Sequence, residues 1–231
     1  MGFGSRISSL AGAALSTLRS DARSLRQMTR TGRRTVFQPF GDTRDNRYPP
    51  FFEFVRDQLG SDTRRQLLSF GCSTGEEVFT LRGYFPNASI KGLDVDGARV
   101  RACRRNLARR GGDADVVFEI ADSTAREPDA AYDAIFAMSV FRNGMVAKNR
   151  LPSCAPALDF AIFENAVADL ARCLKPTGLL ALRAANFRFA DTAASAGFRR
   201  VWETPGAPPV YGRDNALRPN LFSDDGVFQK F

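Results

Sequence analysis

The feature that most constrains the fold is a regular alternation of short apolar runs with longer amphipathic segments. Runs with the length and composition of buried strands lie at 66–70, 89–94, 116–122, 133–141 and 179–185. Helical patterns precede and separate them, near 50–59, 75–83, 97–110 and 158–174. Such an alternation is typical of a parallel sheet that helices cover on both faces. We therefore predict a doubly wound α/β fold, in which "FRRVWET" and "GVFQKF" add an antiparallel edge pair to make a seven-stranded sheet.

The end of the first predicted strand carries a glycine turn. In "LLSFGCSTGEEVFTL", residues 67–81, Gly71 and Gly75 surround the turn, and Glu76 and Glu77 open the next helix. Ligands of doubly wound sheets bind beyond the carboxyl ends of the strands. Glycine lets the backbone turn sharply and approach a ligand, and a helix N-terminus offers unpaired N–H groups. The sequence therefore predicts a ligand site at this turn.

Two acids stand at the ends of the next two strands. Asp94 follows Gly75 by 19 residues, and Asp122 closes the third strand. This spacing is about the one at which an acid reaches the ribose hydroxyls of a bound nucleoside, and Asp122 is placed to meet the base edge. Either acid alone is more often a helix N-cap or a loop carboxylate. A glycine turn and two acids at consecutive strand ends together favour a nucleoside site.

The turn also restricts which nucleoside ligand fits. The chain lacks the GK[ST] of a P-loop, and "GCSTGE" lacks the G-x-G-x-x-G of a dinucleotide site. Glu76 and Glu77 would repel a pyrophosphate, whereas they suit a ligand that carries an ammonium and a sulfonium. These observations favour S-adenosylmethionine.

The chain resembles the class I S-adenosylmethionine-dependent methyltransferases over roughly residues 48–190. The motifs are "LLSFGCSTGEE", "GLDVD", "FEIADS", "YDAIFAMSVF" and "LARCLKPTGLLAL", in that order. The form "SFGCSTGEE" is most similar to the chemotaxis-receptor glutamate methyltransferases, and this resemblance implies that Glu77, Asp94 and Asp122 bind the cofactor. It also implies a Rossmann-like sheet. Three departures argue against a chemotaxis receptor as substrate: too few residues precede Tyr48 for that family's helical domain, its insertion between strands two and three is missing, and Met138 and Ser139 replace its Arg-Asn.

The predicted cofactor site lies at the ends of the first four strands and in the turns after them. We expect contacts from Gly71, Cys72, Ser73, Gly75, Glu77, Asp94, Val95, Asp122, Ser123 and Met138. No catalytic residue and no metal ligand is predicted. The chain has no histidine, which excludes imidazole catalysis and disfavours zinc. Methyl transfer to an O or N acceptor needs a base only where a proton must leave.

The acceptor is expected over the fourth strand and the loop after it. If the acceptor carries an anionic group, three residues are candidates to bind it: Arg142, Asn143 and Lys148. The plainer interpretation of the two cations is that they are solvated charges of a loop. The segment 40–52 is a candidate lid with Arg44 and Tyr48 near the cofactor, and 205–220 is a candidate rim.

Three functions stay open. The first is methyl transfer to a small molecule, lipid, saccharide or peptide. The second is methyl transfer to RNA, which the basic N-terminal arm and the arginines of 99–110 suggest. Against it, no aromatic stacking platform lies among those arginines. The third is a methyltransferase-like binding protein without activity, attached to a membrane.

Residues 1–34 form a basic arm, distinct from the predicted methyltransferase domain at 35–231. The arm holds seven arginines and one acid, and its apolar residues recur at steps of three or four, which predicts an amphipathic helix. Three interpretations stay open: a helix packed on the body or on a second subunit, a helix lying on a membrane surface, or a cleaved targeting peptide. Four cysteines without CxxC spacing favour a reducing compartment, so we expect a cytoplasmic protein, membrane-associated under the second interpretation.

Overall fold

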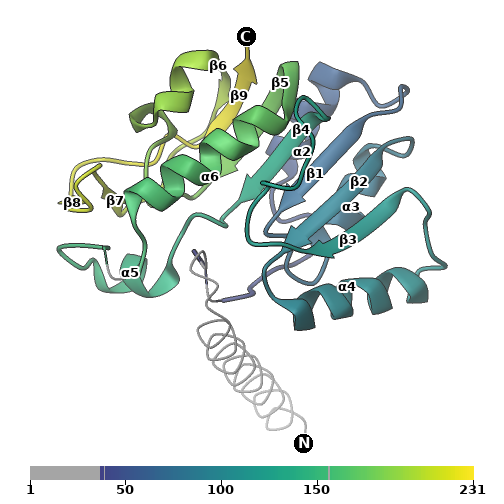
Figure 1. Cartoon of the computed structure of the whole chain (residues 1–231), viewed down its shortest axis with the longest axis horizontal. Helices are drawn as coiled ribbons and strands as arrows, with labels where there is room; N and C mark the ends of the chain where they lie inside the picture. Colours follow the sequence, from purple (N-terminus) through teal and green to yellow (C-terminus); the bar gives the residue numbers. More distant parts are fainter. Residues whose placement is uncertain (1–36, 39, 156) are drawn as a thin grey trace, which may run out of the picture.

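The computed structural model describes residues 37–38, 40–155 and 157–231, so the predicted N-terminal helix lies outside the described residues. Its main sheet has seven strands in the order β3-β2-β1-β4-β5-β9-β6 (Figure 1). Their bounds are β1 Gln66–Phe70, β2 Ser89–Asp94, β3 Val116–Ile120, β4 Tyr132–Met138, β5 Leu174–Arg183, β6 Phe198–Glu203 and β9 Gly226–Lys230. The predicted doubly wound, mostly parallel α/β fold is confirmed.

The C-terminal strands complete the sheet as an antiparallel pair. β9 is antiparallel to both of its neighbours, β5 and β6, and lies between them. A second, two-stranded sheet pairs β7 (Val210–Tyr211) with β8 (Leu217–Arg218), inside the segment predicted as a rim.

The helices that flank the sheet begin and end close to the predicted positions. They are α2 Pro49–Leu59, α3 Glu76–Tyr84, α4 Gly97–Arg109, α5 Gly144–Asn149 and α6 Phe160–Cys173, with short 3₁₀ turns at Phe189–Asp191 and Ala193–Gly197. The sequence did not predict α5. The helix predicted at 158–174 ends at Cys173 as α6, but the strand predicted at 179–185 begins earlier, because "KPTG" (175–178) belongs to the irregular start of β5. Thr177 has a φ of 64° there, and the register with β4 shifts at this point.

Two apolar cores fill the two faces of the sheet, because successive strand side chains point to opposite faces. Leu68 and Ile135 pack with α6 on one face, whereas Leu67 and Phe136 pack with α2, α3 and α4 on the other. The predicted stripe of α6 is buried at Phe160, Phe163, Val167 and Leu170. Both faces are therefore covered, and the ligand-binding edge is left at the carboxyl ends of the strands. Within the described part of the chain, no helix has the length and apolar character that crossing a membrane requires.

Gly226 is expected to tolerate no side chain. A Cβ there would lie 2.3 Å from the backbone oxygen of Trp202 on the neighbouring strand, whereas a Cβ on Gly83, in exposed α3, would meet nothing within 4 Å. Gly226→Ala should lower the free energy of unfolding by about 2 kcal/mol, which corresponds to a fall of about 4–8 °C in melting temperature. Gly83→Ala, the matched control, should raise it by up to about 1 kcal/mol. Equal melting temperatures for the two variants would contradict this packing of β9.

Candidate functional site

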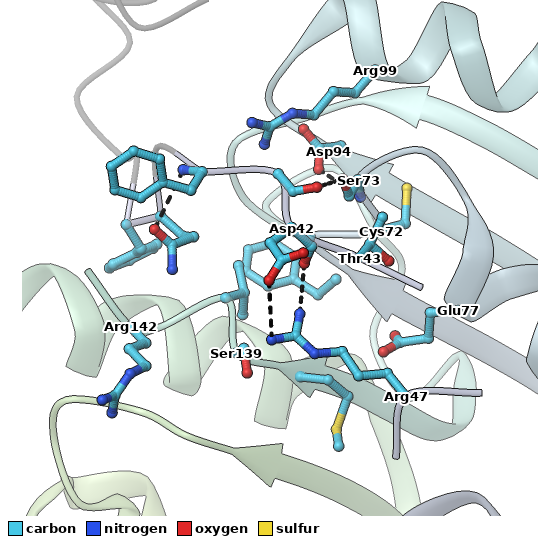
Figure 2. Close-up of a pocket in the computed structure, with 18 of the residues that line it drawn as sticks. Asp42, Thr43, Arg47, Cys72, Ser73, Glu77, Asp94, Arg99, Ser139 and Arg142 are labelled. Atoms are coloured by element: carbon cyan, nitrogen blue, oxygen red, sulfur yellow. Dashed lines mark hydrogen bonds and ion pairs between the residues drawn. The ribbon is translucent and has the colours of Figure 1, made fainter. Parts of the chain in front are cut away.

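A cavity of about 300 Å³ lies beyond the carboxyl ends of β1, β2 and β4 (Figure 2). The turn after β1, the residues after β2 and β3, the end of β4 and the chain segment before α2 all contribute to its wall. The cavity therefore occupies the edge of the sheet where the sequence predicts a ligand.

The turn after β1 depends on residues in the left-handed region. Gly71, Ser73 and Gly75 have φ values of 80°, 51° and 100°. A Cβ on Gly71 would lie 2.6 Å from the Val140 side chain, which follows β4. The close approach of the two strand ends therefore needs glycine at position 71.

Asp94 fixes this turn to the second strand. Its side chain is 5% exposed, and its two carboxylate oxygens accept hydrogen bonds of 2.8 Å from the backbone N–H groups of Ser73 and Asp96. Burial raises the pKa of Asp94, against the effect of these donors and of Arg99. The sequence predicted a ligand-binding acid here. The structure shows that the same carboxylate also joins the β1 turn to the start of α4.

Glu77 brings a second carboxyl to the cavity, partly buried, from the first turn of α3. Its Oε1 accepts a 2.7 Å hydrogen bond from the Ser69 hydroxyl of β1. Burial raises the pKa of Glu77 to about 8, although the Ser69 bond and the charge of Arg47 oppose the shift. Glu76 behaves differently, because it is bonded to the Thr74 hydroxyl and does not line the cavity. Of the two acids that open α3, only Glu77 belongs to the site.

Residues 40–48, which we call the strap, cross the open side of the cavity. The Ser73 hydroxyl donates to the Gly41 carbonyl at 3.2 Å, and the hydroxyls of Tyr48 and Ser139 share a hydrogen bond of 2.6 Å. Arg47 is bonded within the strap to Asp42 (Figure 2). The predicted lid therefore lies over the cavity, and both of its predicted residues, Arg44 and Tyr48, line the wall.

Most of the predicted cofactor residues meet in the cavity wall. Those that line it are Gly71, Cys72, Ser73, Glu77, Asp94, Val95, Asp122 and Met138. Gly75 and Ser123 do not line it. A Cβ on Gly75 would instead meet Phe79 and Phe118 in the core below the turn.

The predicted acceptor residues separate in the structure. Arg142 lines the cavity, but Asn143 caps α5 by accepting from the N–H groups of Met145 and Val146, and Lys148 is exposed outside it. The residues of 205–220 do not line the cavity either.

The sequence did not single out several lining residues, among them Arg47 within the predicted lid, and Arg99, Ser139 and Val140 outside it. The buried face of α4 is formed by Val100 and Cys103, and a helical pattern alone places its arginines in solvent, but Arg99 reaches the cavity. Ser139 stands directly after a buried strand with a φ of 61°, and a polar residue in that place is the one signal available in the sequence.

Asp94→Asn should destabilise the protein even without a ligand. The amide keeps one acceptor oxygen and turns an N–H donor toward a backbone N–H, which should cost about 1–3 kcal/mol. Asp122→Asn is the matched control, since Asp122 makes no hydrogen bond with the described residues, and it should change stability by at most about 0.5 kcal/mol. Chemical denaturation of the ligand-free variants measures both. A stable Asp94→Asn protein would show that the turn does not need this carboxylate.

Comparison with known proteins agrees with this geometry. The family profile described as "Methyltransferase domain" matches residues 68–180, which include the turn, Asp94, Asp122 and β4. Ribosomal RNA small subunit methyltransferase C of Hahella chejuensis is 28% identical over 123 residues, 53% of this chain and 32% of the relative. Trans-aconitate 2-methyltransferase of Methylobacterium radiotolerans is 28% identical over 98 residues, 42% of this chain and 35% of the relative. The chain thus matches about a third of the length of each of these curated relatives.

One solved structure with a similar fold is that of an enzyme named as a cyclase, and not as a methyltransferase. The [4+2]-cyclase SpnF aligns with a TM-score of 0.50 and 20% identity, over 68% of this chain and 60% of its own. At this identity the likeness concerns the fold alone, so the function has to be argued from the site.

Proposed function

We propose that residues 68–180, which match the family profile described as "Methyltransferase domain", form a methyltransferase domain of the class I type with S-adenosylmethionine as its cofactor. The protein then transfers a methyl group to an O or N atom of an acceptor. The acceptor we propose is a small molecule, or a lipid, saccharide or peptide group of similar size. A cavity of about 300 Å³ below a strap supports a small acceptor over a structured RNA.

Glu77 is the observation that carries the proposal. It is a partly buried carboxyl in the cavity wall that accepts a hydrogen bond from Ser69 and forms no ion pair with the described residues. A buried carboxylate is costly unless a cation compensates for it. S-adenosylmethionine carries an ammonium and a sulfonium, and we infer that Glu77 binds its cationic amino-acid end. The acid that meets Ser69 from α3 also supports the finer resemblance to the motif of the chemotaxis-receptor methyltransferases.

Asp94 and Asp122 are proposed to bind the nucleoside end. Each Asp94 oxygen accepts one backbone N–H, so a second lone pair on each stays available for a ribose hydroxyl. Asp122 lines the same wall without a hydrogen bond to the described residues, which suits an amino group on the base edge. Val95 and Ala121 line the wall beside the two acids.

The chain's own contribution to the reaction is positioning and the exclusion of water. The cofactor supplies the activated methyl group when it is bound. The strap closes the cavity through Tyr48 and Ser139, whose hydroxyls mark the β4 side of the wall. A carboxylate or a neutral amine attacks without a base, so a site without histidine suits such acceptors.

The affinity for S-adenosylmethionine should rise about tenfold between pH 6 and pH 7. Only ionised Glu77 attracts the cationic ligand, and with a pKa of about 8 its ionised fraction increases about tenfold over this interval. Isothermal titration calorimetry with S-adenosylmethionine and S-adenosylhomocysteine measures the effect. Glu77→Gln should bind more weakly at pH 7.5 and lose the pH dependence.

Glu76→Gln is the control for this experiment, because it removes the neighbouring carboxylate outside the cavity. It should keep both the affinity and the pH dependence. A protein that binds neither compound would refute the proposed function, and a wild type without pH dependence would refute the role of Glu77.

We also propose that residues 35–231 are a complete binding unit. Phe37, just inside this boundary, is 4% exposed and packs edge-on against Phe141, at 4.9 Å between ring centroids. A chain that starts at residue 35 should therefore bind the cofactor within about twofold of the full chain. A chain that starts at residue 49 lacks the strap and should bind at least about tenfold more weakly, since it loses the bonds to Ser73 and Ser139. Equal binding by both shortened chains would exclude a role for the strap.

A further inference from the structure

Arg142 places an uncompensated positive charge at the cavity. It lines the wall from the loop between β4 and α5, and Figure 2 shows it on the opposite side from Glu77, with Ser139 between them. Its Nη2 donates to the Pro208 carbonyl at 2.9 Å, and its Nη1 is buried without any hydrogen-bond partner. Among the described residues, no carboxylate forms an ion pair with this guanidinium.

Two acids that could compensate Arg142 are already engaged by other donors. Asp225, whose charge acts on Arg142, accepts from Arg183 and from the backbone N–H of Ala184. Asp42, which lines the cavity, is bonded to Arg47. Burial lowers the pKa of Arg142, as expected for a cation that lacks an anionic partner. Because a half-buried guanidinium without an anion lowers stability, its position at the cavity indicates a ligand that supplies the anion.

We propose that Arg142 binds a carboxylate of the methyl acceptor and so selects carboxylated substrates. The inference rests on the proposed methyl transfer and names the acceptor class for the same site. One guanidinium balances one negative charge, and its planar edge matches the two oxygens of a carboxylate.

The two ends of the cavity then bind ligand groups of opposite charge. Glu77 takes the cationic end of the cofactor, and Arg142 takes the anionic end of the acceptor, with the hydroxyls of Tyr48 and Ser139 on the wall shared by both. An acceptor whose carboxylate is replaced by an amide leaves Arg142 without its anion. Such an analogue should be rejected by about 100-fold or more, because a buried polar group would stay unpaired.

Thermal unfolding of the full chain tests the proposal with acetate as the smallest carboxylate probe. Samples hold saturating S-adenosylhomocysteine, and sodium acetate, sodium phosphate and sodium chloride are compared at equal ionic strength, with acetamide as the neutral analogue. Acetate at 100 mM should raise the melting temperature of the wild type by about 3 °C over chloride, and acetamide should not. Arg142→Met should abolish this shift. In chloride it should unfold about 2–4 °C above the wild type, since an unpaired cation has been removed.

Two further variants complete the comparison. Lys148→Met removes an exposed cation from the nearby helix α5 and should keep the full acetate shift. Arg142→Lys keeps the charge but loses the planar edge, so it should show a smaller shift than the wild type. It preserves the test should Arg142→Met fail to fold.

Three outcomes would contradict the proposed role of Arg142. An equal acetate shift in the wild type and Arg142→Met would overturn the proposal, as would a shift with phosphate but not with acetate. A marked loss of stability in Arg142→Met without any acetate shift in the wild type would assign Arg142 to structure through Pro208. Calorimetric binding of S-adenosylhomocysteine by the same samples separates these results from a failure of the proposed function.

Discussion

The carboxylate of Asp94 is the interaction on which the site depends. It joins three parts of the chain through two backbone N–H groups: the end of β2, the turn after β1 and the start of α4. The N–H groups of Gly71 and Cys72 already donate to the Leu93 carbonyl of β2, and the Asp94 bond extends this connection to Ser73 in the turn. A carboxylate suits this place because it offers two acceptor oxygens with lone pairs to spare for a ligand. One residue can therefore organise the site and still take part in binding.

Charge is distributed across the cavity so that one side favours a positively charged ligand group and the other a negatively charged one. Glu77, on one side, is a partly buried carboxyl whose pKa is raised by burial and which has Ser69 as its hydrogen-bond donor. Arg142, on the other, is a half-buried cation with an unpaired nitrogen. Arg47 acts on Glu77 and Asp225 acts on Arg142, but neither forms an ion pair with its group, so a bound ligand of the right charge would add to stability at both places. This arrangement is expected of a site whose polar groups are completed by a cofactor and an acceptor.

Much of the fold could be predicted from the sequence because its signals are local. The apolar runs predicted β1 and β2 with their observed bounds. The residues at the ends of these two strands then indicated Asp94 and the glycine turn as parts of the site. What the sequence missed depends on contacts between distant residues. Nothing near Arg99 indicates that it faces the cavity, and nothing near Arg142 indicates that Pro208 fixes it while the neighbouring Asn143 turns away to cap α5. The predicted start of β5 was also wrong. Pro and Gly after a helix usually mark a loop, but Pro176 and Gly178 belong to an irregular part of the strand.

The central claim is that a partly buried, mostly protonated Glu77 ionises to hold the cationic end of S-adenosylmethionine. Counting the protons released on binding tests it most directly, by titrating at pH 7 in two buffers with different ionisation enthalpies. A pKa of about 8 in the free protein predicts the release of about 0.9 proton per cofactor bound by the wild type, and none by Glu77→Gln. Binding of the cofactor by the wild type without any proton release would contradict the account.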